Sequence, residues 1–539
     1  MDSPEKCENS HQKKIDMGLV EIDDLFQIDA LLILTIVGGA DSTTVMTGYL
    51  GSIRPRKNKS SQNWEIANPE IMNENKIEKW WSLFLNVFGD LHNEEVGYLC
   101  LSRELAYRMR YLGAPDKART GVVDTPAGDA QISEKMPAMK AVEPNFEGIL
   151  FVPNVGSDYC LGTCKKIASQ LRADEPNFPI KFIASYSEID DPEERFESVN
   201  WTTLMNPLFG LRYKSVAKSL AFSKRYLKRL AANPDLSSAA REAFGRFWRL
   251  KIGGVAFKHS IKIEIAGKWL EKNPASVVVT MNDVVRPGAC FITAAKKLGI
   301  STIVIQHGVY GPLNVPFEAD ECWVWGSLTR KFMQSRGAHS SRLHESGNFE
   351  IEYDNPVDIG STNPTKEILL LLQWGGIEIW GDPIFGSIVG ATASAMMEIN
   401  PEWKLRLRAH PSDGEDAKKQ VVRILEEIGI EYSFSQPGCS ILEDVYSSAA
   451  VLAVNSSALA HAIALGIPCL QYLPERLEKR LGTRFVGEEN VARCPQHLVD
   501  WFGALHTDTL NTRENPSLLF SNFGKALQSA SERILMLGT

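Results

Sequence analysis

Between residues 148 and 472 the chain repeats one pattern: a short apolar run, a polar or glycine-containing turn, and then a helical segment. Apolar runs that alternate with helices predict parallel strands joined by helical crossovers. This pattern constrains the fold strongly, because the strands of a parallel sheet are covered by helices on both faces. The sequence therefore predicts an α/β fold built from doubly wound, Rossmann-like parallel sheets.

The predicted strands form two groups separated by a turn-rich stretch. The first group comprises residues 148–154, 180–187, 275–280, 301–305 and 321–325, and the second comprises 367–372, 403–408, 431–434, 451–454 and 469–472. Residues 353–365 contain two prolines, a glycine and several turn formers, so we expect an interdomain linker there. A chain of 539 residues is also too long for one ordinary core. We expect two Rossmann-like domains, 146–352 and 366–510, facing across a cleft, followed by a helix over 511–539.

The region 1–145 has no pattern that assigns its structure. Within it, the apolar run 31–37 followed by GGADSTT (38–44) fits either a phosphate or acceptor loop or an ordinary turn. The opening residues are polar and charged, unlike a secretory signal. The longest apolar run, 30–40, is far shorter than the roughly twenty residues that cross a bilayer. We therefore expect a cytoplasmic protein.

The charge distribution and the cysteine positions limit which ligands and partners we expect. The net charge of −8 gives no reason to expect nucleic-acid binding. Residues 211–251, within a predicted helical insertion at 204–252, carry eleven Lys or Arg and two acidic residues. That segment fits an ordinary surface helix, or a peripheral contact with anionic lipid on the inner face of a membrane, or a track for an anionic acceptor. The nine cysteines show no metal-ligand spacing, so we expect no metal site and no cofactor, and we expect Cys160 and Cys164 to pack on one helix face.

Two strand ends in the second half predict a site for a phosphorylated ligand. The strand 403–408 alternates apolar and basic residues up to Arg408 and stops at His410-Pro411. The apolar run 451–454 ends at Asn455-Ser456-Ser457, and a small-residue helix follows. A charged imidazole donates two hydrogen bonds, and a helix start supplies free N–H groups to an anion. Serine at this place is equally explained by helix capping, and His410 by loop structure.

Acidic and acceptor-side candidates stand at other strand ends. Glu443, just before the strand 451–454, fits either a ribose contact or a solvated helix start. In the first half, Gln306-His307-Gly308 ends a buried strand, and a neutral histidine there is suited to act as a general base. Asp283 and Asp158, which follow two other strands, are alternative bases, and the residues alone do not choose among the three.

Four motifs resemble one group of enzymes. They are QHG (306–308), SGN (346–348), RAHP (408–411) and NSSALAHAIALGIP (455–468). Together, over residues 277–472, they resemble the capsule-polysaccharide and related glycosyltransferases of GT-B fold, which include bacterial polysialyl- and Kdo transferases and CDP-glycerol glycerophosphotransferases.

The resemblance implies roles for individual residues. It implies that His410, Ser456 and Ser457, with Arg408, Pro411, Asn455 and Glu443 around them, bind the donor nucleotide. It places His307 on the acceptor side as the base, with Gln306, Gly308, Gly347 and Asn348 near the acceptor or the cleft. The chain departs from the pattern at His461-Ala462, where such proteins usually carry Glu-Ala, and in having no clear glycine-rich N-terminal opening.

The expected activity is therefore transfer of a sugar or polyol phosphate from a nucleotide-sugar, CMP- or CDP-linked by resemblance, to a saccharide or lipid-linked acceptor in surface-polysaccharide synthesis. The resemblance implies an inverting, metal-independent reaction. Two alternatives stay open: a nucleotide-sugar epimerase of the same fold, and a catalytically inactive scaffold protein.

Overall fold

A computed structural model of the chain describes most of residues 148–538. The described ranges are 148–153, 158–184, 197–200, 253–283, 287–311, 314–351, 366–372, 383–409, 415–436, 439–454, 456–474, 486–507 and 516–538, with residue 484 and isolated positions between 225 and 241. The region 1–145, the predicted linker 353–365 and almost all of the predicted insertion 204–252 lie outside these ranges. The predicted domain boundaries and the predicted cleft therefore stay predictions.

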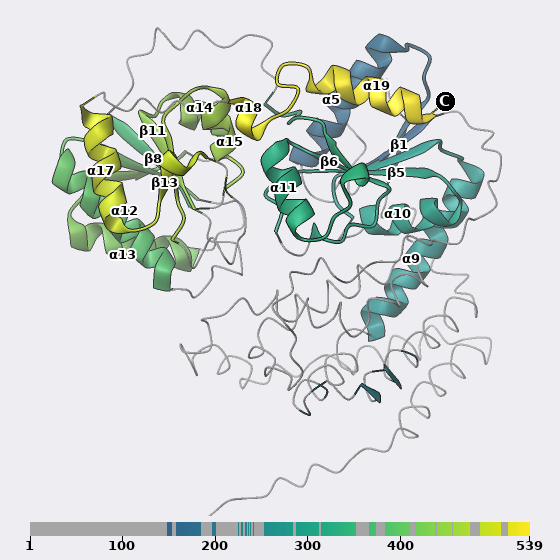
Figure 1. Cartoon of the computed structure of the whole chain (residues 1–539), viewed down its shortest axis with the longest axis horizontal. Coiled ribbons are helices and arrows are strands. Elements are labelled where there is room, and N and C mark those ends of the chain that lie inside the picture. The colour runs from purple at the N-terminus through teal and green to yellow at the C-terminus, as the bar shows by residue number, and fades with distance from the viewer. Residues whose placement is uncertain are drawn as a thin grey trace, which may run out of the picture. The chain divides into compact units, whose positions relative to one another are not determined.

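The first sheet has seven strands in the order β3-β2-β1-β4-β5-β6-β7, and all neighbouring pairs are parallel. Figure 1 labels β1, β5 and β6 of this sheet. Its strands are β1 (Ile149–Val152), β2 (Ile180–Ala184), β3 (Glu197–Asn200), β4 (Val277–Thr280), β5 (Ser301–Ile305), β6 (Glu321–Val324) and β7 (Leu343–Glu345).

The second sheet has six strands in the order β10-β9-β8-β11-β12-β13, again parallel throughout. Its strands are β8 (Glu367–Leu371), β9 (Lys404–Arg408), β10 (Tyr432–Phe434), β11 (Ala450–Ala453), β12 (Cys469–Tyr472) and β13 (Val491–Ala492). In both sheets the chain first adds strands on one side of its first strand and then returns to the other side. This is the doubly wound order of nucleotide-binding folds. The predicted α/β fold with two doubly wound parallel sheets is confirmed.

Helices connect the strands and cover the sheets. They are α5 (Asp158–Asp174), α9 (Gly253–Lys272), α10 (Gly288–Lys297), α11 (Ser327–Ser335), α12 (Pro383–Ile399), α13 (Glu415–Ile428), α14 (Ile441–Tyr446), α15 (Leu459–Ala464), α17 (Pro495–His506), α18 (Pro516–Leu519) and α19 (Ala526–Gly538), with 3-10 turns at Ser340–Arg342 and Glu488–Asn490.

The first sheet has a hydrophobic layer on each face. Alternate residues of β1 belong to different layers: Ile149 and Phe151 pack with α5 and α19, whereas Leu150 and Val152 pack with α9 and α10. This is the period-two alternation of a strand that is buried on both faces. Cys160 and Cys164 are buried in the α5 layer, which confirms that they are packing residues.

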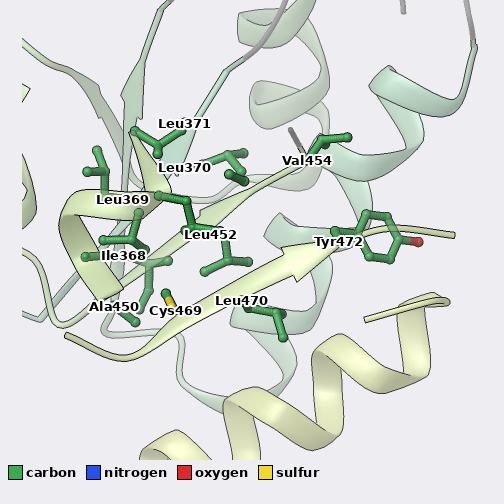
Figure 2. Packing of buried hydrophobic residues seen from close by; sticks show 14 of the residues in the cluster. Ile368, Leu369, Leu370, Leu371, Ala450, Leu452, Val454, Cys469, Leu470 and Tyr472 are labelled. Carbon is green, nitrogen blue, oxygen red and sulfur yellow. The ribbon is translucent and has the colours of Figure 1, made fainter. Parts of the chain in front are cut away.

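The second sheet encloses one large core. Its central strands are mostly apolar, and Figure 2 shows buried side chains of β8, β11 and β12 packed together. Helix α12 contacts both α13 and α17. The strands β8, β11 and β12 are buried along almost their whole length, whereas the edge strand β10 is partly exposed.

The end of the chain differs from the single helix predicted over 511–539. It forms α18 and α19, separated by a segment in which Asn522 and Gly524 adopt positive φ angles of 54° and 77°. We call residues 519–526 the strap. Residue Ser521 donates its N–H to the carbonyl oxygen of Trp325 (2.8 Å) and its hydroxyl to Glu345 Oε2 (2.5 Å). The strap thus lies across the ends of β6 and β7, and α19 continues onto α5.

Candidate functional site

The two topological switch points lie between β1 and β4 and between β8 and β11. In open parallel sheets ligands bind beyond the carboxyl ends of the strands at such points. Most of the predicted site residues follow strand ends of these two sheets. Each sheet edge is described by itself below.

At the second sheet, Arg408 is the last residue of β9, and its side chain forms hydrogen bonds with other residues of the chain. Its guanidinium donates to the Asp444 carboxylate, to the carbonyl oxygen of Ser440 (3.3 Å) and to that of Cys439 (3.1 Å). Asp444 is 3% exposed and lies 3.7 Å from a second cation, Arg406 Nη1. Arg408 keeps 27% of its side chain exposed.

The predicted donor residues His410, Pro411 and Asn455 lie outside the described residues. In the sequence they follow Ala409, which comes after β9, and Val454, which comes after β11. Their predicted roles stay predictions.

Ser456 and Ser457 lie in a turn before α15, which begins at Leu459, two residues later than the sequence predicts. The Ser456 hydroxyl accepts the N–H of Ala458 at 3.3 Å, so it contributes to the helix start. The Ser457 side chain is exposed, and its hydroxyl has no hydrogen-bond partner among the described residues. Of the two predicted serines, Ser457 is thus the one whose hydroxyl is not used by this turn.

Glu443 is used in a helix cap. Ser440 accepts the N–H of Glu443, and the Glu443 carboxylate accepts the N–H of Ser440, forming a capping box at the start of α14. The backbone N–H of Ser440 and the thiol of Cys439 hold the pKa of Glu443 below its usual value. Conversely, Glu443 raises the pKa of Cys439 to about 11, which keeps this thiol protonated. Glu443 therefore has a structural role at the start of a helix, which is one of the two interpretations that the sequence allows.

His461 marks a departure from the resembling sequences, and its surroundings are basic. It lies on α15 and is half-buried. Burial, followed by the charges of Lys166 and Arg408, lowers its pKa to about 4. The imidazole is therefore neutral at physiological pH, where a carboxylate would be negative.

At the first sheet, His307 follows β5 and is partly buried. Its Nδ1 atom is buried and has no hydrogen-bond partner among the described residues. Burial lowers the pKa of His307, against the opposing effects of a hydrogen bond with the Met281 backbone and of the Asp283 charge. The ring is therefore neutral near pH 7, the form in which an imidazole accepts a proton.

Asp283 and Asp158, the alternative bases, are placed differently. Asp283 is buried at 3% exposure, acts electrostatically on His307, and accepts the N–H of Glu318 with Oδ2 at 2.6 Å. Asp158 begins α5 after β1, and its side chain lies outside the description. Asp283 and His307 follow β4 and β5, which are neighbouring strands of the first sheet.

Gln306 links two strands of the sheet. Its side-chain Oε1 accepts the N–H of Trp325 (2.8 Å), its Nε2 donates to the carbonyl of Gly308 (2.9 Å), and its own carbonyl accepts from the Trp325 indole (3.1 Å). Both polar ends of the amide are occupied within the protein. Gln306 therefore fixes the turn that carries His307.

Gly347 is explained by the strap, and Asn348 by a contact with the next residues of the chain. A Cβ atom on Gly347, whose φ is 90°, would lie 2.5 Å from the Ser521 carbonyl oxygen and 2.6 Å from the Ala526 Cβ. Asn348 Oδ1 accepts the N–H of Glu350 (3.0 Å), while its buried Nδ2 has no partner among the described residues. Gly308, by contrast, would accommodate a Cβ atom with no atom within 4 Å.

Sequence reasoning missed two residues that organise these edges, Asp444 and Glu318. Arg406 and Arg408 stand two residues apart on one strand and so share a face, which is a sequence signal for a buried counter-charge. Glu318 offers no comparable signal, because its contacts come from Asp283, Thr293 and Lys296.

The described part of the chain contains neither a metal site nor a membrane-spanning helix. None of the groups of His, Cys, Asp and Glu in this part of the chain is arranged to hold a metal ion. None of the helices described there is both long enough and apolar enough to cross a membrane.

Comparisons with known proteins give structural similarities only. No model of a known protein family matches the chain, and no curated protein does. A glycosyltransferase from Rickettsia africae is similar with a TM-score of 0.44 and 10% identity, covering 73% of this chain and 98% of its own. The lipopolysaccharide outer core galactosyltransferase WaaB gives 0.42 and 13%, covering 72% and 99%. A UDP-GlcNAc 2-epimerase from Neisseria meningitidis gives 0.41 and 11%, covering 72% and 100%. Similarity of this extent does not by itself assign an activity to the chain.

Proposed function

We propose that this protein is a GT-B glycosyltransferase that moves a sugar or polyol phosphate from a nucleotide-activated donor to a saccharide or lipid-linked acceptor. The observation that carries the proposal is the pair of doubly wound sheets with different chemistry at their carboxyl edges. One edge carries a neutral histidine after β5 and a buried aspartate after the neighbouring β4, and the other carries a partly exposed arginine and an exposed serine. Among the described residues, Gln306 follows β5, Ser346 follows β7 and Arg408 ends β9.

His307 is the proposed base. It accepts the proton of the acceptor hydroxyl, and the resulting oxygen nucleophile attacks the anomeric carbon of the donor as the bond to the nucleotide phosphate breaks. Attack opposite the leaving group inverts the configuration at that carbon. A neutral imidazole, whose Nδ1 has no hydrogen-bond partner among the described residues, supports this assignment. Asp283 is a weaker candidate, because its Oδ2 already accepts the N–H of Glu318.

The leaving nucleotide phosphate is the proposed ligand of His410, Ser456 and Ser457. Hydrogen-bond donors directed at the phosphate stabilise the negative charge that develops as the bond breaks. The partly exposed Arg408 adds positive charge at the same strand tips. A CMP- or CDP-linked donor, a reaction that needs no metal, and a place in surface-polysaccharide synthesis are proposed from the sequence resemblance.

The donor assignment is tested by thermal shift with CMP, CDP, UDP and GDP. We expect one nucleotide to raise the melting temperature of the wild type and to lose most of this effect in His410→Ala. The matched control is His506→Ala, a histidine that pairs with Asn400 (3.0 Å) where α12 and α17 end, at the opposite edge of the second sheet. If no nucleotide raises the melting temperature, or if His410→Ala responds like the control, the donor site is wrong.

The reaction class is tested by product analysis with the nucleotide-sugar that binds. We expect transfer to a saccharide or lipid-linked acceptor, unchanged by a metal chelator and abolished by His307→Gln. Release of free hexosamine from a UDP-sugar without an acceptor would show an epimerase instead. Nucleotide binding without turnover on any acceptor would show an inactive scaffold.

Membrane association is a separate proposal for the basic segment 211–251. Flotation with liposomes that contain or lack anionic lipid tests it. Equal recovery with both kinds of liposome contradicts it, and recovery only with anionic liposomes supports it.

A further inference from the structure

The strand pair β5–β6 ends in an exchange of hydrogen bonds between Gln306 and Trp325. The last regular bond of the ladder joins the Gln306 N–H to the Trp323 carbonyl (2.8 Å). In a parallel ladder the next bond would join the Trp325 N–H to the Gln306 carbonyl. Here the Trp325 N–H donates instead to the Gln306 side-chain Oε1 (2.8 Å), and the Gln306 carbonyl accepts from the Trp325 indole (3.1 Å). Each residue thus satisfies the backbone of the other with its side chain.

This exchange sets the backbone on both sides of His307. The Gln306 carbonyl and the His307 N–H belong to one planar peptide group, so the indole that holds the carbonyl also fixes the direction of the chain as it enters His307. Among the described residues, the indole is the one hydrogen-bond donor to this peptide group. On the other side of His307, Gln306 Nε2 donates to the Gly308 carbonyl (2.9 Å).

Burial makes the indole hydrogen bond hard to replace. Gln306 and Trp325 are each 2% exposed, so water does not readily take the place of a lost donor. A buried carbonyl that is left without a partner is costly. We therefore expect the peptide group before His307 to turn toward another donor when the indole N–H is removed.

The strap holds Trp325 in place from the opposite side. Ser521 donates its N–H to the Trp325 carbonyl (2.8 Å), and the Phe520 ring lies 6.2 Å from the Trp325 ring. The backbone of the strap comes so close that a Cβ atom on Gly326 would lie 2.5 Å from the Leu519 carbonyl oxygen. The indole is therefore packed between the strap and the end of β5.

We propose that Trp325 is a positioning residue for His307: its indole N–H holds the peptide group that enters the histidine, and the strap holds the indole. The meaning of this role in catalysis rests on the proposed function of His307 as the base. The hydrogen bonds from Ser521 through Trp325 to Gln306 do not depend on that function.

Trp325→Phe tests the proposal, because it removes the indole N–H and keeps an aromatic ring. Trp323→Phe is the matched control: Trp323 lies on β6, is also buried, and donates its indole N–H to Glu321 Oε2 (2.9 Å). Isotope-labelled histidine gives NMR signals for the backbone amides of the ten histidines, and that of His307 is identified by its loss in His307→Gln. We expect the His307 amide signal to move in Trp325→Phe and to stay in place in Trp323→Phe.

The control has its own expected response. The His344 ring lies 5.4 Å from the Trp323 ring, so in Trp323→Phe we expect the His344 signal to move instead. In active enzyme we expect Trp325→Phe to lower kcat about tenfold with the KM for the donor unchanged, because a displaced base slows the chemical step without removing a donor contact. Trp323→Phe should leave both constants close to the wild-type values.

A His307 amide signal that stays in place in folded Trp325→Phe overturns the proposal, and so does an equal fall of kcat in Trp323→Phe. If Trp325→Phe does not fold, Phe520→Leu loosens the indole from the strap side, and we expect a smaller movement of the same signal. An unmoved signal in that variant also overturns the proposal. The NMR measurement needs no turnover, so absence of transferase activity refutes the proposed function while the amide signal still decides the role of Trp325.

Discussion

The Asp444 carboxylate forms an ion pair with Arg408 while only 3% of its side chain is exposed. Arg406 approaches the other carboxylate oxygen at 3.7 Å, so two basic side chains of β9 share one buried acid. Arg408 is the last residue of β9, two positions before His410. The shared acid therefore fixes the strand tip from which the predicted donor loop departs.

Removing this acid tests its importance. We expect Asp444→Ala to lower the free energy of unfolding by about 2–4 kcal/mol, because two partly buried cations lose their partner. Chemical denaturation measures the change. Glu431→Ala is the matched control: it breaks the exposed pair with Lys404 on the same strand (2.5 Å), and we expect less than about 0.5 kcal/mol. Similar losses in both variants would contradict the assigned role of Asp444.

The strap predicts an effect at Gly347. An alanine there would meet the Ser521 carbonyl at 2.5 Å in a left-handed backbone conformation, so we expect Gly347→Ala to cost about 2–4 kcal/mol. Gly162→Ala, in α5 with no atom within 4 Å of the new Cβ, should instead stabilise by about 0.5–1 kcal/mol. The denaturation midpoint measures both effects. If it does not fall in Gly347→Ala while it rises in Gly162→Ala, the described contact between Gly347 and the strap is wrong.

We expect the two serines before α15 to have different roles, Ser456 in stability and Ser457 in nucleotide binding. Ser456→Ala removes the acceptor of the Ala458 N–H and should cost about 1 kcal/mol of stability. Ser457→Ala should leave stability nearly unchanged and weaken nucleotide binding about tenfold, as for the loss of one hydrogen bond to a charged group. Denaturation and nucleotide titration measure the two effects. Unchanged affinity in Ser457→Ala would remove this serine from the donor site.

His461 predicts a pH dependence of stability. Its pKa is about 4 in the folded protein, against about 6.5 in an unfolded chain. The unfolded state therefore binds more protons as the pH falls below about 6.5, and stability falls with it. Between about pH 7.5 and pH 5 we expect this histidine to account for a loss of about 2 kcal/mol. Comparison of wild type with His461→Gln at both pH values measures it, and equal acid sensitivity of the two proteins would refute it.

Much of the fold follows from apolar runs, and the exceptions are short edge strands. Strands β4, β5, β8 and β11 are continuous apolar runs because helices cover both faces, and the sequence predicts each of them. Strands β3, β7 and β13 were not predicted. They read ESVN, LHE and VA, too short or too polar for a periodic signal, and each lies at a sheet edge with one neighbour.

The candidate site could likewise be predicted only in part from the sequence. A strand end followed by a polar residue is visible in the sequence, which is why His307, Asp283 and Arg408 could be singled out. Whether such a residue is free for a ligand depends on partners far away in the chain. Gln306 is engaged by Trp325, and Gly347 is required by Ser521, a residue that follows the whole second sheet. No local sequence pattern predicts contacts between residues so far apart in the chain.

The strap also determines when the first sheet can be completed during synthesis. Ala526, Ala530 and Ile534 of α19 belong to the same hydrophobic layer as β1 and α5. A nascent chain that has left the ribosome only as far as β7 still exposes this apolar surface. That surface stays uncovered until the second sheet has been translated, so we expect truncation before residue 526 to leave the first sheet prone to aggregation.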